Sequence, residues 1–400
     1  MIFQPQLRIP GPTPIPDRVV RSGARPMVDH RGPEFKCVVQ DVVAGVKRVF
    51  GTANDLLIYT ASGSGGLESA VANLVSSGDK VVAGIAGNFG ERFAAIAHAY
   101  GCDLVRLEVE WGEPVEPEDL GATLAAHPDA KLVLLTHNET STGITNPLPD
   151  LARAVHEAGC LLAVDGVSSV GSIPIDVDSN GIDVAVTGSQ KGFMAPPGIC
   201  FVTVSQRAWE ANATAKAPRS YFDWGPTAAA VKQGATPYTP AIGVLHAVQE
   251  GLRMMEEEGL DAVYRRHRMI ADGVAAGLQA MGFALFAAEG YRSAVVTAAI
   301  PPQGLEPDTY RALLRKRYGV VLGGGQGRMT GRMVRVGHLG AVAEGDMVQV
   351  LWAMEQALED LDVQPNEGRG VGALSERWRE SPRPGVGPSA SDRTLRSSSR

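Results

Sequence analysis

One lysine lies where a lysine side chain is seldom found. Lys191 follows the apolar run 183–188 and precedes a Pro-Pro-Gly turn at 196–198. A lysine at such a position usually extends its ammonium group to solvent. Burial would instead lower the pKa of the amine, and a neutral amine is a nucleophile that can form a Schiff base. Lys191 is therefore the first candidate for covalent chemistry.

A carboxylate ends the preceding apolar run. Asp165 closes "LLAVD" and lies 26 residues before Lys191. It can cap the turn that follows, which is a common role of Asp at the end of a strand. It can also hold a cationic ring nitrogen in a poorly solvated crevice, where opposite charges attract far more strongly than in water. Both interpretations stay open at this point.

A glycine-rich turn, "TASGSGGLESA" at 60–70, leads from a strand pattern into a helical one. Its free amides would hold an anion, with Ser62 and Ser64 adding hydroxyl donors. The turn lacks the Walker lysine and the GxGxxG spacing, so it does not indicate a nucleoside triphosphate or a dinucleotide. A purely structural turn explains the glycines equally well.

Clustered hydroxyls in "HNETSTG" at 137–143 close another apolar run. They form a simple turn or lie near a phenolate oxygen.

Together, the lysine, the carboxylate, the anion-binding turn and the hydroxyls match one cofactor. Pyridoxal 5'-phosphate has an aldehyde, a pyridine nitrogen, a phosphate and a phenolic oxygen, and each has a candidate partner.

Short apolar runs alternate with helical patterns through the first half of the chain. The runs at 55–60, 79–85, 131–137, 160–166 and 183–188 are bounded by glycine and polar turns. This alternation predicts an α/β fold whose buried sheet is mostly parallel. Such sheets bind ligands at the carboxyl ends of their strands, which is where the candidate residues lie.

The composition and residue patterns of the sequence divide the chain into four parts. We predict an N-terminal arm at 1–20, a large cofactor-binding α/β domain at 21–250 and a smaller C-terminal α+β domain at 251–362. The tail at 363–400 is rich in Pro, Gly, Ser and Arg, and we expect it to be disordered.

Composition restricts the classes of function. The 400 residues carry a net charge of -7, so neither nucleic acid nor an acidic membrane is an expected partner. No apolar run reaches the length of about 18 residues that a membrane helix needs. The four cysteines show neither CxxC nor His-paired spacing, so we predict no metal site and expect reduced thiols in a cytoplasmic protein.

Three motifs resemble those of a known enzyme family. They are "VTGSQKGFMAPPGICFV" around Lys191, "AVDGVSSVG" before it and "MVRVGHLG" after it, and the likeness runs from residue 7 to about 362. The sequence resembles the class V, fold-type I pyridoxal-phosphate aminotransferases, above all their alanine–glyoxylate, serine–glyoxylate and serine–pyruvate branch. The resemblance implies a large domain with a mostly parallel seven-stranded sheet and a smaller C-terminal α+β domain.

The resemblance also implies catalytic roles. Lys191 forms the Schiff base with the cofactor and moves the substrate proton, and Asp165 keeps the pyridine nitrogen protonated. Arg335 clamps the substrate carboxylate, a task suited to its planar fork of donors; an exposed strand arginine is the alternative. Phe89 stacks on the cofactor with a smaller surface than the Trp that close relatives often have, unless it is a core residue.

Further cofactor-binding positions follow from the same resemblance. Thr239, in "TPYTP" at 236–240, matches a segment that a neighbouring subunit lends to the phosphate site, which implies a homodimer with the active site at the subunit interface. The other implied positions are Ser62, Gly63, Ser64, Thr140 and Gln190.

The leading hypothesis is an aminotransferase that moves an amino group from alanine or serine to glyoxylate or pyruvate by a ping-pong Schiff-base mechanism. One alternative is a lyase or cysteine desulfurase of the same fold. Desulfurases of this fold use a mobile cysteine in the C-terminal half, and no cysteine follows Cys200. The other alternative is a non-catalytic subunit, which need not retain Lys191, Asp165 and Arg335 together.

Overall fold

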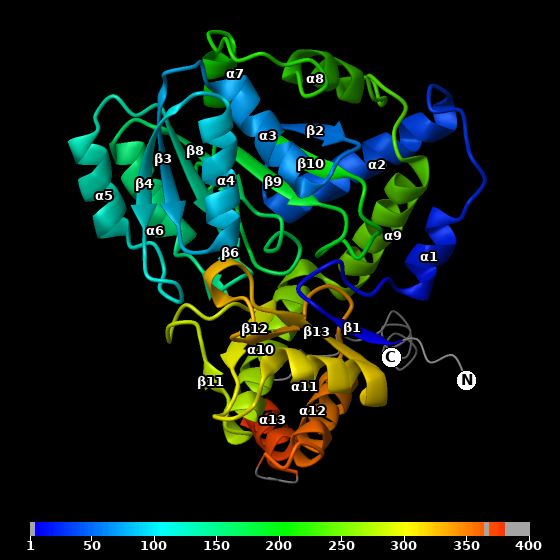
Figure 1. Ribbon diagram of the computed structural model, residues 1–400. Coiled ribbons are helices and arrows are strands. Elements are labelled where there is room, and N and C mark those ends of the chain that lie inside the picture. The colour runs from blue at the N-terminus through cyan, green and yellow to red at the C-terminus, as the bar shows by residue number, and fades with distance from the viewer. Residues whose placement is uncertain (1–4, 364–367, 381–400) are drawn as a thin grey trace, which may run out of the picture.

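The computed structural model describes residues 5–363 and 368–380. It contains a seven-stranded sheet in the larger region and a five-stranded sheet in the smaller one, each with its own helices (Figure 1). In sheet order, the strands of the large sheet are β2 (Asp55–Tyr59), β10 (Cys200–Val204), β9 (Val184–Gly188), β8 (Leu161–Asp165), β5 (Leu132–Thr136), β3 (Lys80–Ile85) and β4 (Asp103–Glu108).

The large sheet is mostly parallel, as the alternating pattern predicts. Strands β9, β8, β5, β3 and β4 run parallel, whereas β10 pairs antiparallel with both β9 and β2. The predicted fold class is therefore confirmed. Because parallel strands end at one edge, residues that follow β8 and β9 come together there.

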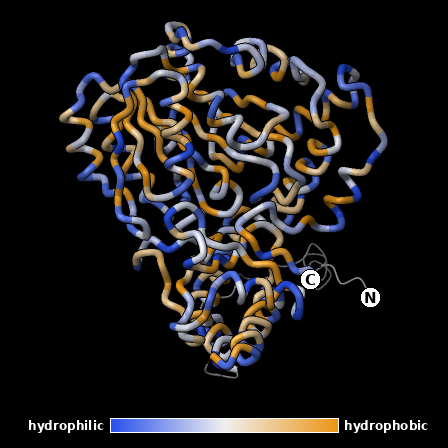
Figure 2. Tube along the Cα trace, in the orientation of Figure 1, coloured by the Kyte–Doolittle hydropathy of each residue, from blue (hydrophilic) through white to orange (hydrophobic). Residues whose placement is uncertain are grey.

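Helices cover both faces of the large sheet. Successive strand residues point to opposite faces, so Leu134 joins the core cluster with α3 and α4, and its neighbour Leu135 joins the cluster with α2, α6 and α9. The central strands are correspondingly rich in apolar residues (Figure 2), whereas the edge strand β4, with the sequence DLVRLE, also carries charged ones. The helices of this region are α2 (Pro33–Phe50), α3 (Gly63–Leu74), α4 (Asn88–Ala99), α5 (Pro117–Ala126), α6 (Leu148–Glu157), α7 (Gln206–Asn212), α8 (Trp224–Lys232) and α9 (Ile242–Glu258).

The smaller region has its own core, in which the apolar faces of its helices pack on a mixed sheet. Its strands, in sheet order, are β1 (Gln6–Arg8), β13 (Val320–Gly324), β14 (Val334–Gly337), β12 (Val296–Ile300) and β11 (Ala284–Leu285). Its helices are α10 (Leu260–Ala280), α11 (Pro307–Leu313), α12 (Glu344–Glu359) and α13 (Arg369–Glu380), with a π-helical turn at Leu314–Tyr318 and a 3-10 turn at Gly327–Met329.

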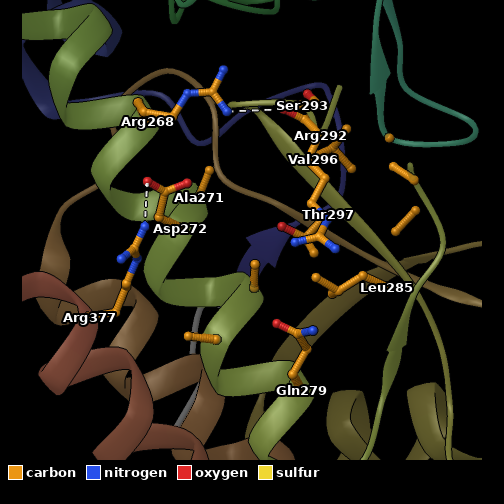
Figure 3. Close-up of a pocket in the computed structure, with 15 residues that line it drawn as sticks. Arg268, Ala271, Asp272, Gln279, Leu285, Arg292, Ser293, Val296, Thr297 and Arg377 are labelled. Carbon is orange, nitrogen blue, oxygen red and sulfur yellow. Dashed lines mark hydrogen bonds and ion pairs between the residues drawn. The ribbon is translucent and has the colours of Figure 1, made fainter. Parts of the chain in front are cut away.

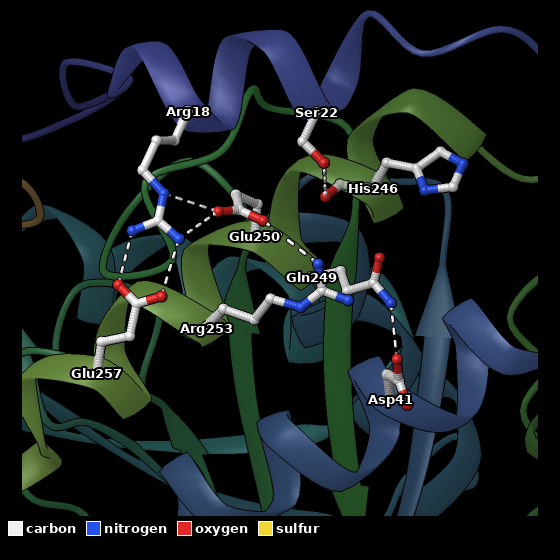
Figure 4. Close-up of polar contacts among 8 residues, drawn as sticks. All are labelled: Arg18, Ser22, Asp41, His246, Gln249, Glu250, Arg253 and Glu257. Atoms are coloured by element: carbon white, nitrogen blue, oxygen red, sulfur yellow. Dashed lines mark hydrogen bonds and ion pairs between the residues drawn. The ribbon is translucent and has the colours of Figure 1, made fainter. Parts of the chain in front are cut away.

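The N-terminal residues join both regions. Strand β1 pairs with β13, and helix α1 (Asp17–Gly23) lies on α9 (Figure 4). Arg18 donates to Glu250 at 2.9 Å and to Glu257 at 2.6 and 2.9 Å, and the Ser22 hydroxyl donates to the carbonyl of His246 at 2.9 Å. The predicted boundary at 250 falls inside α9 rather than between elements.

The predicted disorder of 363–400 is wrong for residues 369–380, which form α13 against α10. Leu374 and Trp378 lie one helical turn apart and are buried, and Trp378 Nε1 donates to the carbonyl of Met269 at 2.8 Å. The average composition of the tail concealed this short amphipathic pattern. Residues 364–367 and 381–400 lie outside the described residues. None of the described helices is both long and apolar enough to cross a membrane.

Candidate active site

A cavity of about 380 Å³ opens at the carboxyl ends of the parallel strands. Strands β8 and β9 lie side by side, so the residues at and just after their ends reach the same wall. The predicted site residues that line this cavity are Ser62, Gly63, Ser64, Phe89, Thr140, Asp165, Gln190 and Lys191. The fold thus brings together residues that are up to 129 positions apart, from Ser62 to Lys191.

Lys191 is buried, with 9% of its side chain exposed, and its Nζ donates to the carbonyl of Pro10. Burial lowers the pKa of its amine to about 8, because the charged form loses its hydration. The carboxylate of Asp165 opposes this shift, and the guanidinium of Arg335 adds to it. A much larger fraction of the amine is therefore neutral near neutral pH than in an exposed lysine.

Asp165 is 5% exposed, and its Oδ1 accepts a hydrogen bond from the amide of Val167 at 2.9 Å. Burial raises the pKa of this carboxyl to about 6, although the Val167 amide acts in the opposite direction. The residue caps the turn and also lines the cavity. Its two interpretations are therefore compatible, since the capping bond uses one of its two oxygens.

The anion-binding turn is the start of α3. Ser62 occupies the N-cap position, and Gly63 and Ser64 are the first helical residues, whose amides have no acceptor inside the helix. A side chain at Gly63 would place its Cβ 2.5 Å from a methyl group of Val167, so any larger residue would displace Val167 from the cavity wall. The amides and hydroxyls here suit a phosphate.

Arg92 lines the same cavity and was missed by the sequence analysis. Its Nη1 lies 3.5 Å from the Ser64 hydroxyl, and its guanidinium lies 5.0 Å from the centre of the Phe89 ring. It follows Phe89 by three residues on α4, which is the spacing of neighbours on a helix surface. That spacing was the signal available in the sequence.

Glu139 was also missed, although it stands among the hydroxyls of 137–143. Its fully buried carboxylate accepts from the amides of Phe89 at 2.9 Å and Gly90 at 3.0 Å, and from Ser141. It therefore fixes the start of α4 and with it the backbone of Phe89. Burial raises the pKa of this carboxyl, and the amides limit the rise.

Arg335 lies on β14 and is 6% exposed, so the alternative of an exposed strand arginine is wrong. Its Nη1 donates to the carbonyl of Thr140 and its Nε to that of Gly324, both at 2.7 Å. Burial lowers its pKa to about 10, and the charge of Glu139 opposes this. The side chain is thus held beside Thr140, which lines the cavity.

Thr239 does not join the other predicted residues. It is exposed and does not line the cavity of its own chain. Its neighbour Tyr238 stacks on Tyr221, with ring centres 5.1 Å apart. The role of Thr239 in a neighbouring subunit stays a prediction.

The cavity contains a partner for each reactive part of pyridoxal 5'-phosphate. The buried amine of Lys191 can react with the aldehyde, and the buried carboxylate of Asp165 can pair with the ring nitrogen. The start of α3, with its two serines, can bind the phosphate. No group of three or more His, Cys, Asp or Glu side chains suited to a metal ion occurs within residues 5–363 and 368–380.

Comparison with known proteins places these observations in a family. The family described as aminotransferase class-V matches residues 17–342. A serine–glyoxylate aminotransferase from Methylorubrum extorquens is 36% identical over 94% of this chain and 96% of its own. A protein named "Soluble hydrogenase, small subunit" from Synechococcus sp. is 39% identical over 92% of this chain and 97% of its own.

Comparison with solved structures supports the same family. The crystal structure of an alanine–glyoxylate aminotransferase from Nostoc sp. matches with a TM-score of 0.86 and 30% identity. The match covers 90% of this chain and 96% of that one. The likeness therefore extends over both sheets and is not limited to the cofactor cavity.

Proposed function

This chain belongs to the class-V aminotransferase family and uses pyridoxal 5'-phosphate, and we propose that it transfers an amino group from alanine or serine to glyoxylate or pyruvate. The observation that carries the proposal is the buried Lys191 amine, whose pKa is lowered to about 8, in one cavity with Asp165. The names of the Methylorubrum and Nostoc relatives support glyoxylate as the acceptor.

When bound, pyridoxal 5'-phosphate supplies an aldehyde that accepts the amino group and a ring that withdraws electrons. Lys191 would hold the cofactor through its amine and, once free and neutral, take the proton from the α-carbon of the substrate. Asp165 would stabilise the proton on the ring nitrogen. The start of α3, with Ser62 and Ser64, would bind the phosphate.

Arg335 would bind the carboxylate that amino donor and oxo acceptor share. One arginine then serves both half-reactions, because the two substrates occupy the site in turn. Its contacts with the carbonyls of Thr140 and Gly324 orient the guanidinium before any substrate arrives. Binding therefore costs less conformational entropy than it would with a mobile arginine.

The reaction is tested by incubating the purified protein with alanine and glyoxylate and measuring pyruvate, and with serine and pyruvate and measuring alanine. Product should require both substrates, and double-reciprocal plots should be parallel, as in a ping-pong reaction. Sulfide from cysteine would instead favour the lyase alternative. If no pair of substrates exchanges an amino group, the chain acts as a non-catalytic subunit and the proposal is wrong.

The proposal includes a homodimer in the cytoplasm. Tyr221 and Tyr238 are 40% and 48% exposed and stack next to Thr239, so an aromatic surface lies beside the segment that a partner subunit would receive. The four cysteines are free and three are buried, which suits a reducing compartment.

Subunit mixing tests the shared site. In a hybrid dimer of Lys191→Ala and Thr239→Asp chains, one site has both substitutions and the other has neither. Random reassociation should therefore restore about a quarter of the wild-type activity from two inactive proteins. If Thr239 served its own chain, mixing would restore none.

A further inference from the structure

A second cavity, of about 220 Å³, lies between α10 and the strands β11 and β12 (Figure 3). It shares no lining residue with the cofactor cavity. Its polar lining includes Arg268 and Asp272 from α10, Arg292 just before β12, and Arg377 from α13. Two helices and the segment before β12 therefore direct charged side chains toward one space.

Arg292 is the unusual member of this lining. Its Nε is buried, and no acceptor for it occurs in the part of the chain that the structure describes. Figure 3 shows its guanidinium extending beside Thr297 into the space between β12 and α10. A buried guanidinium donor without an acceptor is costly, and an anion in the cavity would remove that cost.

The carboxylate in the lining does not neutralise Arg292. Asp272 Oδ2 lies 3.9 Å from Nη2 of Arg377, and Figure 3 shows the two side chains paired. Arg268 donates through Nη1 to the backbone carbonyl of Arg292 at 3.0 Å. Within residues 5–363 and 368–380, neither Arg268 nor Arg292 forms an ion pair, so the cavity attracts negative charge.

Apolar side chains from α10, β11 and β12 line part of the remaining wall, together with the polar Gln279, Ser293 and Thr297, and the space is small. An inorganic anion would pair with the arginines and leave the apolar walls unfilled, whereas a short carbon chain would cover them. The volume is below the range of about 300–1,000 Å³ that holds larger ligands, which excludes a nucleotide. The apolar part of the lining includes Ala271, Ala275, Ala276, Leu285, Val296 and Ala298.

We propose that this cavity binds a small organic carboxylate, with its head group on Arg292 and Arg268 and its carbon chain against the alanines of α10. The planar fork of an arginine matches a carboxylate with two parallel hydrogen bonds. The site is separate from the one in which Arg335 receives the substrate carboxylate. Each chain would then bind carboxylates at two places, the substrate at Arg335 and a second small carboxylate at Arg292 and Arg268.

The test titrates propionate into the full-length holoenzyme and follows the heat of binding. Wild type should show two binding events per chain, of which Arg335→Gln removes one and Arg292→Gln weakens the other at least tenfold. Arg265→Gln is the matched control, since Arg265 lies on the same helix, is exposed and does not line the cavity. Equal propionate binding by Arg292→Gln and wild type would overturn the proposal.

A second variant covers the case in which Arg292→Gln fails to fold. Ala276→Leu fills the cavity and leaves every charge in place, so it should also remove the second event while cofactor absorbance and substrate turnover persist. Propionamide, which has the same shape without the charge, should bind at least tenfold more weakly than propionate. Unchanged propionate affinity in Ala276→Leu, or equal affinity for propionamide, would contradict the assignment.

Discussion

Two groups of charged residues in this protein lie in opposite environments. In the cofactor cavity, Lys191 and Asp165 are 9% and 5% exposed. At the junction of α1 and α9 (Figure 4), the side chains of Arg18 and Glu257 are 43% and 57% exposed, and they form an ion pair at 2.6 Å. The cofactor cavity keeps its charged side chains largely out of contact with solvent, whereas the junction holds a close pair that is exposed to it.

The contrast shows that burial matters more to the chemistry of these groups than the closeness of a partner. Desolvation is the largest cause of the lowered pKa of Lys191 and of the raised pKa of Asp165. Water screens the Arg18 pair, so its contribution to stability is small despite its short distance. The charges assigned to the reaction are buried and incompletely paired, whereas the Arg18–Glu257 pair that joins α1 to α9 is closely paired and exposed.

The largest test of this contrast replaces the buried amine. Lys191→Ala should lower the transamination rate by at least about 1,000-fold, because it removes both the covalent attachment and the proton carrier. The rate is measured with saturating cofactor, and circular dichroism checks the fold. Lys232→Ala removes an amine whose side chain is 66% exposed and should react at the wild-type rate. A Lys191→Ala rate within tenfold of wild type would contradict the role of this residue.

The second test removes the buried carboxylate. Asp165→Asn should lower kcat on the order of 100-fold, since the cofactor ring loses the charge that stabilises its protonated nitrogen. Asp129→Asn changes an exposed carboxylate and should leave kcat unchanged. Equal kcat values for the two variants would show that Asp165 only caps its turn.

Asp165→Asn should also shift the pH dependence with which Lys191 captures the cofactor, and the direction of the shift can be predicted. Only the neutral amine of Lys191 captures the aldehyde, so capture by protein stripped of cofactor should rise with pH and be half-maximal near its pKa of about 8. The charge of Asp165 raises that pKa, so Asp165→Asn should lower it and move the profile toward lower pH. The change in cofactor absorbance gives the rate at each pH. A shift toward higher pH would contradict the electrostatic link between the two residues.

The parts of the site that the sequence predicted are local in the chain. Lys191 and Asp165 each end an apolar strand pattern, and parallel strands end at one edge of the sheet. The same is true of the glycine-rich turn at the start of α3. A residue at a strand end can therefore be recognised from its immediate neighbours alone.

Glu139 was missed because its role depends on a contact between distant segments. It acts through the amides of Phe89 and Gly90, about 50 positions away, which no local pattern of residues indicates. The prediction of disorder for residues 369–380 was wrong for a different reason. Trp378 is stabilised by a partner on α10, which composition cannot show, so a region of polar average composition contains a packed helix.

The third test changes a buried guanidinium that the contrast assigns to substrate binding. Arg335→Lys keeps the charge but loses the planar fork, so kcat/KM should fall about 10- to 100-fold for amino donor and oxo acceptor alike. Arg317→Lys is the matched control, because Arg317 is a strongly exposed arginine of the same region. A loss confined to one of the two substrates would show that Arg335 does not bind the carboxylate that they share.

The smallest effect is expected at the exposed junction. Glu257→Gln should change the melting temperature by no more than about 2 °C, because water already solvates both side chains of the Arg18–Glu257 pair. Arg18→Gln also removes the contact with the largely buried Glu250 and should therefore lower the melting temperature more. Their transamination rates should equal that of wild type. High salt should remove whatever difference remains, since it screens exposed charges and not buried ones. If the pair instead stabilised the fold as strongly as a buried group, Glu257→Gln would melt far below wild type, and distance rather than burial would govern the charges of this protein.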